Sequence, residues 1–380
     1  MEIAFDYTYG VAAASGIGRY ANRLARAFTK TALADDFFSL FFIDFLRSFR
    51  KEISCPECAS DSRFSFAPAH LLPARVYERL WNLPGIRHAA SIVPKDAELC
   101  HITSHAAIPI PKRIKKACTI HDMAAWRFRD APTMAKDRKS IRANALRADA
   151  ILTDSQFSAD DILQFIPESA GKVHVIHLGI DNDVFRPAKP EDIAAMRKAL
   201  GLDRPYILSV GLVHPTKNHV FLGRVLESLG NTDVELVISG APSYSYEDIR
   251  KEISSLRSAD RIRFIGRVDD AWLPALYSGA ELYATASLSE GFGFTPLEAM
   301  SCGTPVVSSA AGSLPEVLRD AATVIKEYSI DSWSDKISRL LNDTTYRQER
   351  ISVGQAWSAR YTWEETAKKT LAAYRQILKS

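Results

Sequence analysis

Residues 290–307 read EGFGFTPLEAMSCGTPVV and give the strongest structural signal in the chain. A predicted strand ends near Ala284, and the two glycines of this stretch permit backbone geometry that is closed to other residues. Thr295 is a natural helix cap and Pro296 suits the first helical position, so we expect a helix to begin there. A further strand is predicted at 305–308. Strand, glycine turn, helix and strand in this order indicate one βαβ unit of a parallel sheet.

The same stretch offers groups that could bind a ligand. A helix N-terminus with free N–H groups is a ready anion site. Glu290 precedes the turn, and we expect Glu298 inside the first helical turn, so that both carboxylates face one ligand. Carboxylates accept hydrogen bonds from sugar and ribose hydroxyls. The alternative is an ordinary strand–turn–helix with exposed glutamates, which would fit either carboxylate taken alone.

Short apolar runs alternate with helical stretches along the rest of the chain. In the first half, strands are predicted at 2–6, 38–45, 98–102, 117–121, 150–153 and 173–176, and helices at 18–30, 138–148 and 159–165. In the second half, strands are predicted at 206–210, 235–239, 262–265, 282–284 and 305–308, with helices between them. This alternation predicts an α/β protein with two Rossmann-like, doubly wound parallel sheets.

The boundary between the two halves is expected in the proline-containing, charged segment 181–190. The predicted domains are 1–185 and 186–360, followed by a last helix within 361–380. Apolar residues of that helix follow helical spacing: Ala367, Leu371, Tyr374 and Ile377. We therefore expect the helix to bury this face by packing back toward the N-terminal domain.

Composition excludes several classes of protein. The 380 residues are 47% hydrophobic and 24% charged, which is ordinary for a soluble enzyme. A formal net charge of +3 is too small to indicate a nucleic-acid partner. No signal peptide is visible, and no apolar run reaches the roughly 18 residues of a membrane span. We therefore predict a cytoplasmic protein.

Cations outnumber acidic residues between Lys112 and Arg147. Two interpretations stay open for this segment. It is either a solvated helix face or a patch that meets an anionic acceptor, such as a lipid phosphate at the inner face of the membrane.

Five cysteines, an odd and sparse set, argue against a disulfide framework and fit a reducing compartment. Cys55 and Cys58 form a lone C-x-x-C without the second ligand pair of a structural zinc site. We interpret this motif as a surface loop.

The Glu290–x7–Glu298 string and the residues that follow it resemble the signature of the retaining glycosyltransferases of family 4, which have the GT-B fold. Further stretches resemble family motifs in the same order along most of the chain: GIGRY (16–20), TIHD (119–122), TDSQFS (153–158), SVG (209–211) with KN (217–218), SLPEV (313–317) and YTW (361–363). The resemblance implies a nucleotide sugar held in a cleft between two domains, with a C-terminal helix that crosses back.

The resemblance also implies roles for matching residues. Glu290 would contact the donor sugar, Lys217 would neutralise the diphosphate, and His121 would be a hydrogen-bond partner in the transition state. Glu298 would bind the ribose. The remaining donor-binding positions would be Gly18 and Gly211 near the phosphates, Arg267 and Val268 at the base, and Gly291, Phe292, Gly293, Phe294 and Thr295 along the sugar and diphosphate. Asp122 either orients His121 or caps a turn.

One departure from the family pattern concerns the second phosphate-binding cation. Family members usually pair the lysine with a nearby arginine, but the candidate positions hold Leu212 and Thr216. His214 is the other potential cation of this loop. The departure puts donor affinity in doubt.

No Asp-x-Asp metal motif stands out, so we predict metal-independent catalysis without a cofactor, with the nucleoside diphosphate sugar as donor substrate. The style of the motifs favours GDP-mannose as the donor, from which mannose is transferred, and a UDP-hexose is the second choice of donor. The acceptor is expected to be a glycan or a lipid-linked molecule. Two rivals stay open. A silent sugar-binding protein of the same fold is one. An NAD-dependent dehydrogenase is the other, but Gly16-x-Gly18-x-x-Ala21 lies too far from its strand to suit that fingerprint.

Overall fold

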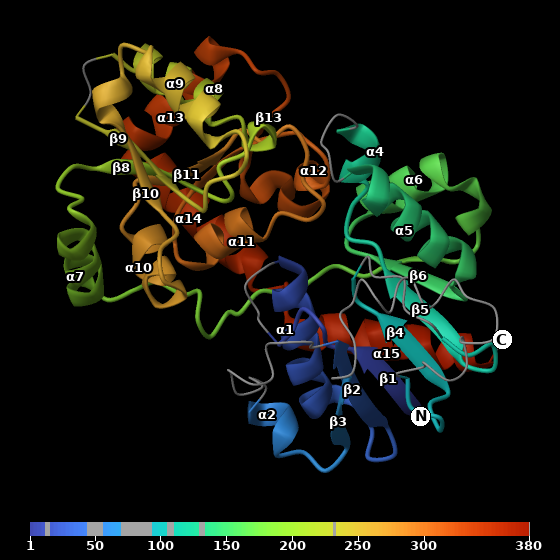
Figure 1. The fold of residues 1–380 in the computed structure, drawn as a ribbon. Helices are drawn as coiled ribbons and strands as arrows, with labels where there is room; N and C mark the ends of the chain where they lie inside the picture. Colours follow the sequence, from blue (N-terminus) through green and yellow to red (C-terminus); the bar gives the residue numbers. More distant parts are fainter. Residues whose placement is uncertain are drawn as a thin grey trace. The chain divides into compact units, whose positions relative to one another are not determined.

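The computed structural model describes residues 1–11, 16–43, 56–69, 93–104, 110–128, 134–230 and 233–379. It divides the chain into two compact units, Met1–Gly179 with Trp363–Ser380, and Ile180–Thr362 (Figure 1). The first unit therefore ends at 179 and not at the predicted 185. The reason is that Ser301 Oγ donates to the Phe185 carbonyl at 2.6 Å and the Phe185 ring packs on Tyr277, which fixes this segment to the second unit.

The first unit is a seven-stranded parallel sheet with the order β3-β2-β1-β4-β5-β6-β7. Its strands are β1 (Glu2–Asp6), β2 (Phe37–Ile43), β3 (Phe64–Ala69), β4 (Leu99–Ile102), β5 (Lys115–Thr119), β6 (Ala150–Thr153) and β7 (Val173–Val175). The chain runs outward from β1 to β3 and then restarts at β4 on the other side of β1. The order therefore reverses between β1 and β4, and an open sheet of this kind offers its ligand site at the carboxyl ends of the two strands where that happens.

The helices of this unit are α1 (Gly16–Thr31), α2 (Pro56–Ala59), α4 (Ala124–Arg127), α5 (Met134–Arg147), α6 (Gln156–Phe165) and α15 (Trp363–Lys379). The last helix packs beside α1 within the first unit (Figure 1). Lys30 pairs with Glu364 at 3.2 Å and Arg375 with Asp36 at 2.7 Å. Its predicted apolar face is the buried one, with Leu371 and Tyr374 at most 1% exposed.

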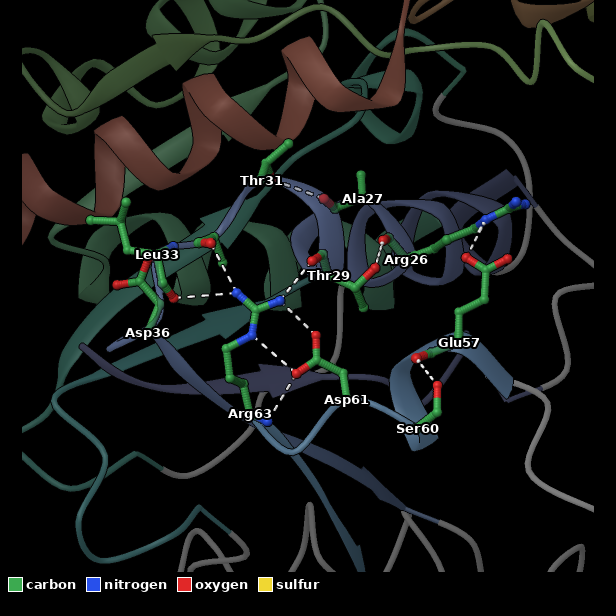
Figure 2. Close-up of polar contacts among 11 residues, drawn as sticks. Arg26, Ala27, Thr29, Thr31, Leu33, Asp36, Glu57, Ser60, Asp61 and Arg63 are labelled. Atoms are coloured by element: carbon green, nitrogen blue, oxygen red, sulfur yellow. Dashed lines mark hydrogen bonds and ion pairs between the residues drawn. The ribbon is translucent and has the colours of Figure 1, made fainter.

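The described residues 56–69 contain an element that the sequence analysis did not predict, the edge strand β3. Arg63, just before β3, inserts its guanidinium at the C-terminal end of α1 (Figure 2). It donates to the carbonyls of Thr29 at 2.6 Å and Ala32 at 2.9 Å, and Asp61 holds it at 2.6 Å. The guanidinium thus satisfies carbonyls that a helix end leaves unpaired.

The second unit is a six-stranded parallel sheet with the order β10-β9-β8-β11-β12-β13. Its strands are β8 (Tyr206–Val210), β9 (Glu235–Ser239), β10 (Ile262–Gly266), β11 (Leu282–Thr285), β12 (Val306–Ser309) and β13 (Thr323–Ile325). The order reverses between β8 and β11. Both units are therefore doubly wound parallel sheets, as predicted.

The helices of the second unit are α7 (Pro190–Leu200), α8 (His219–Ser228), α9 (Tyr246–Ser254), α10 (Leu273–Ser278), α11 (Phe294–Ser301), α12 (Leu314–Leu318), α13 (Ile330–Asn342) and α14 (Thr344–Ser358). The fully buried Trp333 of α13 and Leu222 of α8 join the strand residues Ile238 and Val307 in one core. This core holds the carboxyl ends of β8 and β11 in place.

The cysteines show one error in the sequence interpretation. Cys58, Cys100, Cys118 and Cys302 are free and buried, as expected without a disulfide framework. Cys55 lies outside the described residues. Cys58, however, is not on a surface loop, because it is fully buried on α2. Over the described residues, no helix combines the length and apolar character that crossing a membrane requires.

Candidate active site

Lys217 and Glu290 meet at the point where the strand order of the second unit reverses. Lys217 ends the short turn Pro215–Lys217 after β8, and Glu290 lies in the loop after β11. Lys217 Nζ donates to Glu290 Oε1 at 2.5 Å, with the two side chains only 23% and 17% exposed. Ser287 Oγ donates to the same oxygen at 2.6 Å. The structure therefore brings together two of the three predicted catalytic residues.

The loop after β12 supports the main chain of Glu290 from behind. Ser313 donates to the Glu290 carbonyl through both its main-chain N–H and its hydroxyl, each at 3.0 Å. Gly312 has a φ of +63°, and a Cβ there would stand 2.3 Å from the Glu290 carbonyl oxygen. Only glycine allows this approach, so three successive loops together fix the position of one carboxylate.

The loop after β8 is tied to the loop after β11. The Leu288 N–H donates to the Thr216 carbonyl at 2.7 Å. His214 Nδ1 accepts from the Thr216 N–H, so this nitrogen carries no proton. Partial burial and the nearby Lys217 lower the pKa of His214. His214 is therefore neutral and does not supply the second cation that the sequence left open.

The helix after the glycine turn begins earlier than predicted. Gly293, with a φ of +98°, caps α11, which starts at Phe294. Thr295 is not the cap; its hydroxyl instead accepts from the Tyr283 hydroxyl at 2.7 Å. The prediction failed because a glycine can take the left-handed conformation that turns the chain directly into the helix. Gly291 and Phe292 lie in the turn before it, with Phe292 only 4% exposed.

Glu298 lies beyond the first turn of α11 and not within it, because the helix starts earlier. The residue is only 2% exposed, and the Tyr277 hydroxyl donates to its Oε2 at 2.9 Å. Burial and the neighbouring Glu298 raise the pKa of Tyr277 well above its usual value, so Tyr277 stays a donor. Tyr277 therefore positions the carboxylate, and the ribose contact of Glu298 stays a prediction.

Glycines keep side chains away from the carboxyl ends of β8, β9 and β10. A Cβ on Gly240 would stand 1.7 Å from the carbonyl oxygen of Gly211, and a Cβ on Gly211 would stand 3.3 Å from Cε of Lys217. After β10, the exposed Arg267 forms an ion pair with Asp270, with 3.9 Å between its Nη2 and the Oδ1 of Asp270. The next residue, Val268, is buried, at 6% exposure. The predicted donor-binding positions of this unit, from Gly211 to Glu298, thus follow the carboxyl ends of neighbouring strands.

His121 lies at the corresponding edge of the first unit, just after β5. Its Nδ1 is 2.6 Å from Oδ2 of the buried Asp154, which follows β6. Nε2 is buried and makes no hydrogen bond with any residue in the described ranges. Burial alone would lower the pKa of His121, but the carboxylates of Asp154 and Asp122 raise it. The imidazole is thus held by Asp154 at Nδ1, and a main-chain hydrogen bond with Thr103 also favours its charged form.

The other predicted residues of this unit take structural positions. Asp122 caps a turn, since its Oδ1 accepts from the Ala124 N–H at 2.9 Å. Gly18 is the third residue of α1 and not part of a loop. His101 is fully buried between Tyr374 and Thr119, and burial together with the nearby His121 lowers its pKa to about 3. His101 is therefore a neutral core residue.

Two family models divide the chain between them. The family described as Glycosyltransferase Family 4 matches residues 14–184, and Glycosyl transferases group 1 matches residues 192–357. The chain is 30% identical over 277 residues to the O-antigen chain mannosyltransferase B of Escherichia coli, which covers 70% of this chain and 72% of that protein. The chain belongs to the group 1 and family 4 glycosyltransferases.

Further similarities of this glycosyltransferase concern its fold and its length. It is 31% identical over 241 residues to a D-inositol 3-phosphate glycosyltransferase of Mycolicibacterium paratuberculosis, covering 61% of this chain and 54% of that protein. The match thus spans about half the length of that relative. The sucrose-phosphate synthase of Thermosynechococcus elongatus has a TM-score of 0.75 at 20% identity, with 99% of both chains covered. The two Rossmann-like sheets of the chain, together with this similarity to a solved structure, confirm the predicted α/β fold of GT-B type.

Asp154 is the site residue that the sequence analysis missed in this glycosyltransferase. It appeared there only as part of the TDSQFS stretch, whose Ser155 caps α6 by accepting from the Ser158 N–H. The available signal was its place directly after β6, since β5 and β6 are neighbours and their carboxyl ends meet. Over the described residues, no three His, Cys, Asp or Glu side chains gather as metal ligands. Metal independence itself stays a prediction.

Proposed function

We propose that this glycosyltransferase moves a hexose from a nucleoside diphosphate sugar to a glycan or lipid-linked acceptor, with retention at the anomeric carbon. The observation that carries the proposal is the pair of Lys217 and Glu290 at the strand reversal of the second unit, 2.5 Å apart. A lysine suits phosphate oxygens and a carboxylate suits sugar hydroxyls. A sugar diphosphate offers both groups to one site.

The pair changes partners when the donor binds. The diphosphate takes the ammonium of Lys217, and the carboxylate of Glu290 turns to the hydroxyls of the sugar. Ser287 stays on Oε1, where Lys217 also bonds, so Oε2 of Glu290 serves as the acceptor for the sugar hydroxyls. Lys217 then stabilises the charge that develops on the leaving diphosphate. The N–H groups at the tip of α11 add to this stabilisation.

The acceptor hydroxyl attacks the face of the sugar that the diphosphate leaves. A phosphate oxygen of the leaving group takes the acceptor proton, so the configuration is retained without a protein nucleophile. His121 donates a hydrogen bond to an oxygen of the substrate in the transition state. A cation and a helix N-terminus at the diphosphate replace the charge that a divalent metal would supply, so the proposed reaction is metal-independent.

Mannose from GDP-mannose is the first donor that we propose, and a UDP-hexose is the second. The similarity to a mannosyltransferase of O-antigen chains supports mannose and a growing glycan as acceptor. Contact of the basic segment with an anionic membrane surface is part of the proposal. Arg142 of that segment pairs with Glu168 at 2.5 Å, so only part of its charge is available to a lipid.

The test is donor hydrolysis and transfer with a panel of nucleotide sugars, measured with and without EDTA. We expect one donor, GDP-mannose first, to be turned over at the same rate with the chelator. The anomer of the product, determined by NMR, should match that of the donor. Binding of NAD in place of a nucleoside diphosphate would contradict the proposal, and nucleotide binding without turnover of any donor would favour the silent binding protein.

A further inference from the structure

His121 and Asp154 form a buried pair that the family motifs do not explain. The motif around His121 ends at Asp122, which the sequence offered as the residue that orients the ring. Instead, Asp122 accepts from the Ala124 N–H at 2.9 Å, whereas Asp154, from the next strand, is 2.6 Å from Nδ1 of His121. The side chain of Asp154 is 5% exposed and that of His121 is 14% exposed.

The ring is held from several elements. Ser158 of α6 donates to the His121 carbonyl at 3.0 Å, which ties the loop after β5 to the helix after β6. The Tyr20 ring of α1 meets the imidazole edge-on, with ring centroids 4.8 Å apart. The orientation of the imidazole is therefore fixed by packing as well as by the carboxylate, so that Nδ1 faces Asp154 and Nε2 faces away from it.

Few charged groups surround the ring. Asp154 and Asp122 are the acidic groups near it, and His101 is the nearest titratable group on β4 and is neutral. The Tyr20 hydroxyl points to Thr119, with its oxygen 3.0 Å from Oγ1, and stays protonated because burial raises its pKa. A hydrogen bond between the main chain of Thr103 and the ring also raises the pKa of His121. Asp154 is thus the one carboxylate in hydrogen-bond contact with the imidazole.

We infer that Asp154 is the positioning residue of this glycosyltransferase. It holds His121 as an imidazolium whose Nε2–H donates to an acceptor oxygen of the substrate. The inference rests on the proposed function only for the identity of that oxygen. Besides Asp154, the main chain of Thr103 also bonds the ring, but Nε2 makes no hydrogen bond of ordinary geometry among the described residues, so a substrate oxygen on that side completes the site.

The protonation state sets the direction of the pH dependence. An imidazolium is required, so kcat/KM falls as the pH rises through the pKa of His121. Asp154 raises that pKa, and its removal lowers it. The Asp154→Asn variant should therefore lose activity at a lower pH on the basic side than the unchanged protein. A neutral histidine that acts as a base would give the opposite profile, with activity lost on the acidic side.

The test compares Asp154→Asn with the matched control Asp122→Asn, which keeps an acceptor for the Ala124 N–H. In the full chain labelled with ¹³C-histidine, NMR follows the titration of the His121 ring, which the His121→Gln variant identifies. We expect the ring of Asp154→Asn to titrate at lower pH and kcat/KM to fall at least about tenfold. In Asp122→Asn we expect only a small change in the titration of the His121 ring and in kcat/KM.

Adding Asp154→Asn to His121→Gln should cost no further activity, because Asp154 acts through the ring. An unchanged titration in Asp154→Asn, or losses that multiply in the double variant, would overturn the inference. If Asp154→Asn fails to fold, the titration of the unchanged protein decides, since a His121 pKa at or below the usual value is then the contrary result. The NMR titration needs no turnover, so failure of the proposed function leaves this test intact.

Discussion

At the scale of single residues, the loop after β8 offers one cation where the family pattern usually has two. His214 stands in the loop that could supply the second cation, but it is neutral because its Nδ1 accepts a main-chain N–H. Leu212 is 47% exposed beside it and carries no charge. Lys217 is therefore the only cation that the loop 211–217, all of it described, brings to a diphosphate. The contribution of Lys217 to donor binding and turnover should therefore be large.

Replacing Lys217 by Ala or Glu290 by Gln should reduce kcat/KM by about 100-fold or more, because each removes a group that stabilises charge or binds hydroxyls in the transition state. Steady-state kinetics with the preferred donor measure the effect. Lys336→Ala, an exposed lysine on α13, is the matched control and should retain full activity. Near-normal turnover in both site variants would show that the pair does not bind the donor.

At the scale of elements, polar side chains hold the ends of helices and loops where hydrophobic burial cannot. The end of α1 is the clearest case in the first unit. Arg63 donates to the carbonyls of Thr29 and Ala32 and is itself fixed by Asp61 (Figure 2). A half-buried guanidinium with several acceptors stabilises a helix end more than an exposed ion pair does.

Arg63→Ala should lower the free energy of unfolding of the first unit by about 1–3 kcal/mol, since carbonyls at the end of α1 lose a charged donor. Arg26→Ala is the control on the same helix; Arg26 pairs with Glu57 at 2.6 Å, and the two side chains are 35% and 47% exposed. That change should cost only about 0–1 kcal/mol. Urea unfolding of both variants measures the difference, and equal losses would refute the role given to Arg63.

At the scale of the whole molecule, the two units are built differently along the chain. The second unit is continuous, and its ends meet, since the Ile180 N–H donates to the Tyr361 carbonyl at 3.1 Å. The first unit is discontinuous and takes its last helix from the end of the chain. Tyr374 of that helix is fully buried and bonds His101 in the core, while Thr366 donates to the His177 carbonyl at 2.9 Å.

A fragment of residues 180–362 should fold alone and bind a nucleoside diphosphate, because it contains the whole second sheet. A fragment of residues 1–179 should not fold cooperatively, since it lacks the apolar face of α15. Joining 363–380 to 179 through a short glycine–serine linker should restore folding, because Thr366 and His177 are in contact. Circular dichroism with thermal unfolding tests all three, and a cooperative transition in 1–179 alone would contradict this account.

The fold class and most of the elements follow from the amino-acid sequence alone. Apolar runs of strand length between helical stretches predicted the two sheets, because a strand that is buried on both faces has to be apolar along its length. The strand at Glu2–Asp6 and that at Ala150–Thr153 have the predicted bounds. The resemblance to family motifs also put Glu290 and Lys217 in one predicted site, and the structure brings their side chains together.

Which side chains act together, in contrast, depends on how the chain folds. Asp154 and His121 are distant in sequence, and their contact depends on β5 and β6 lying side by side. The edge strand β3 was not predicted, and its position depends on pairing with β2. The start of α11 depends on the left-handed Gly293, and the charge of His214 depends on a main-chain N–H. Local patterns fix local structure, but contacts between loops of different strands exist only after the chain has folded.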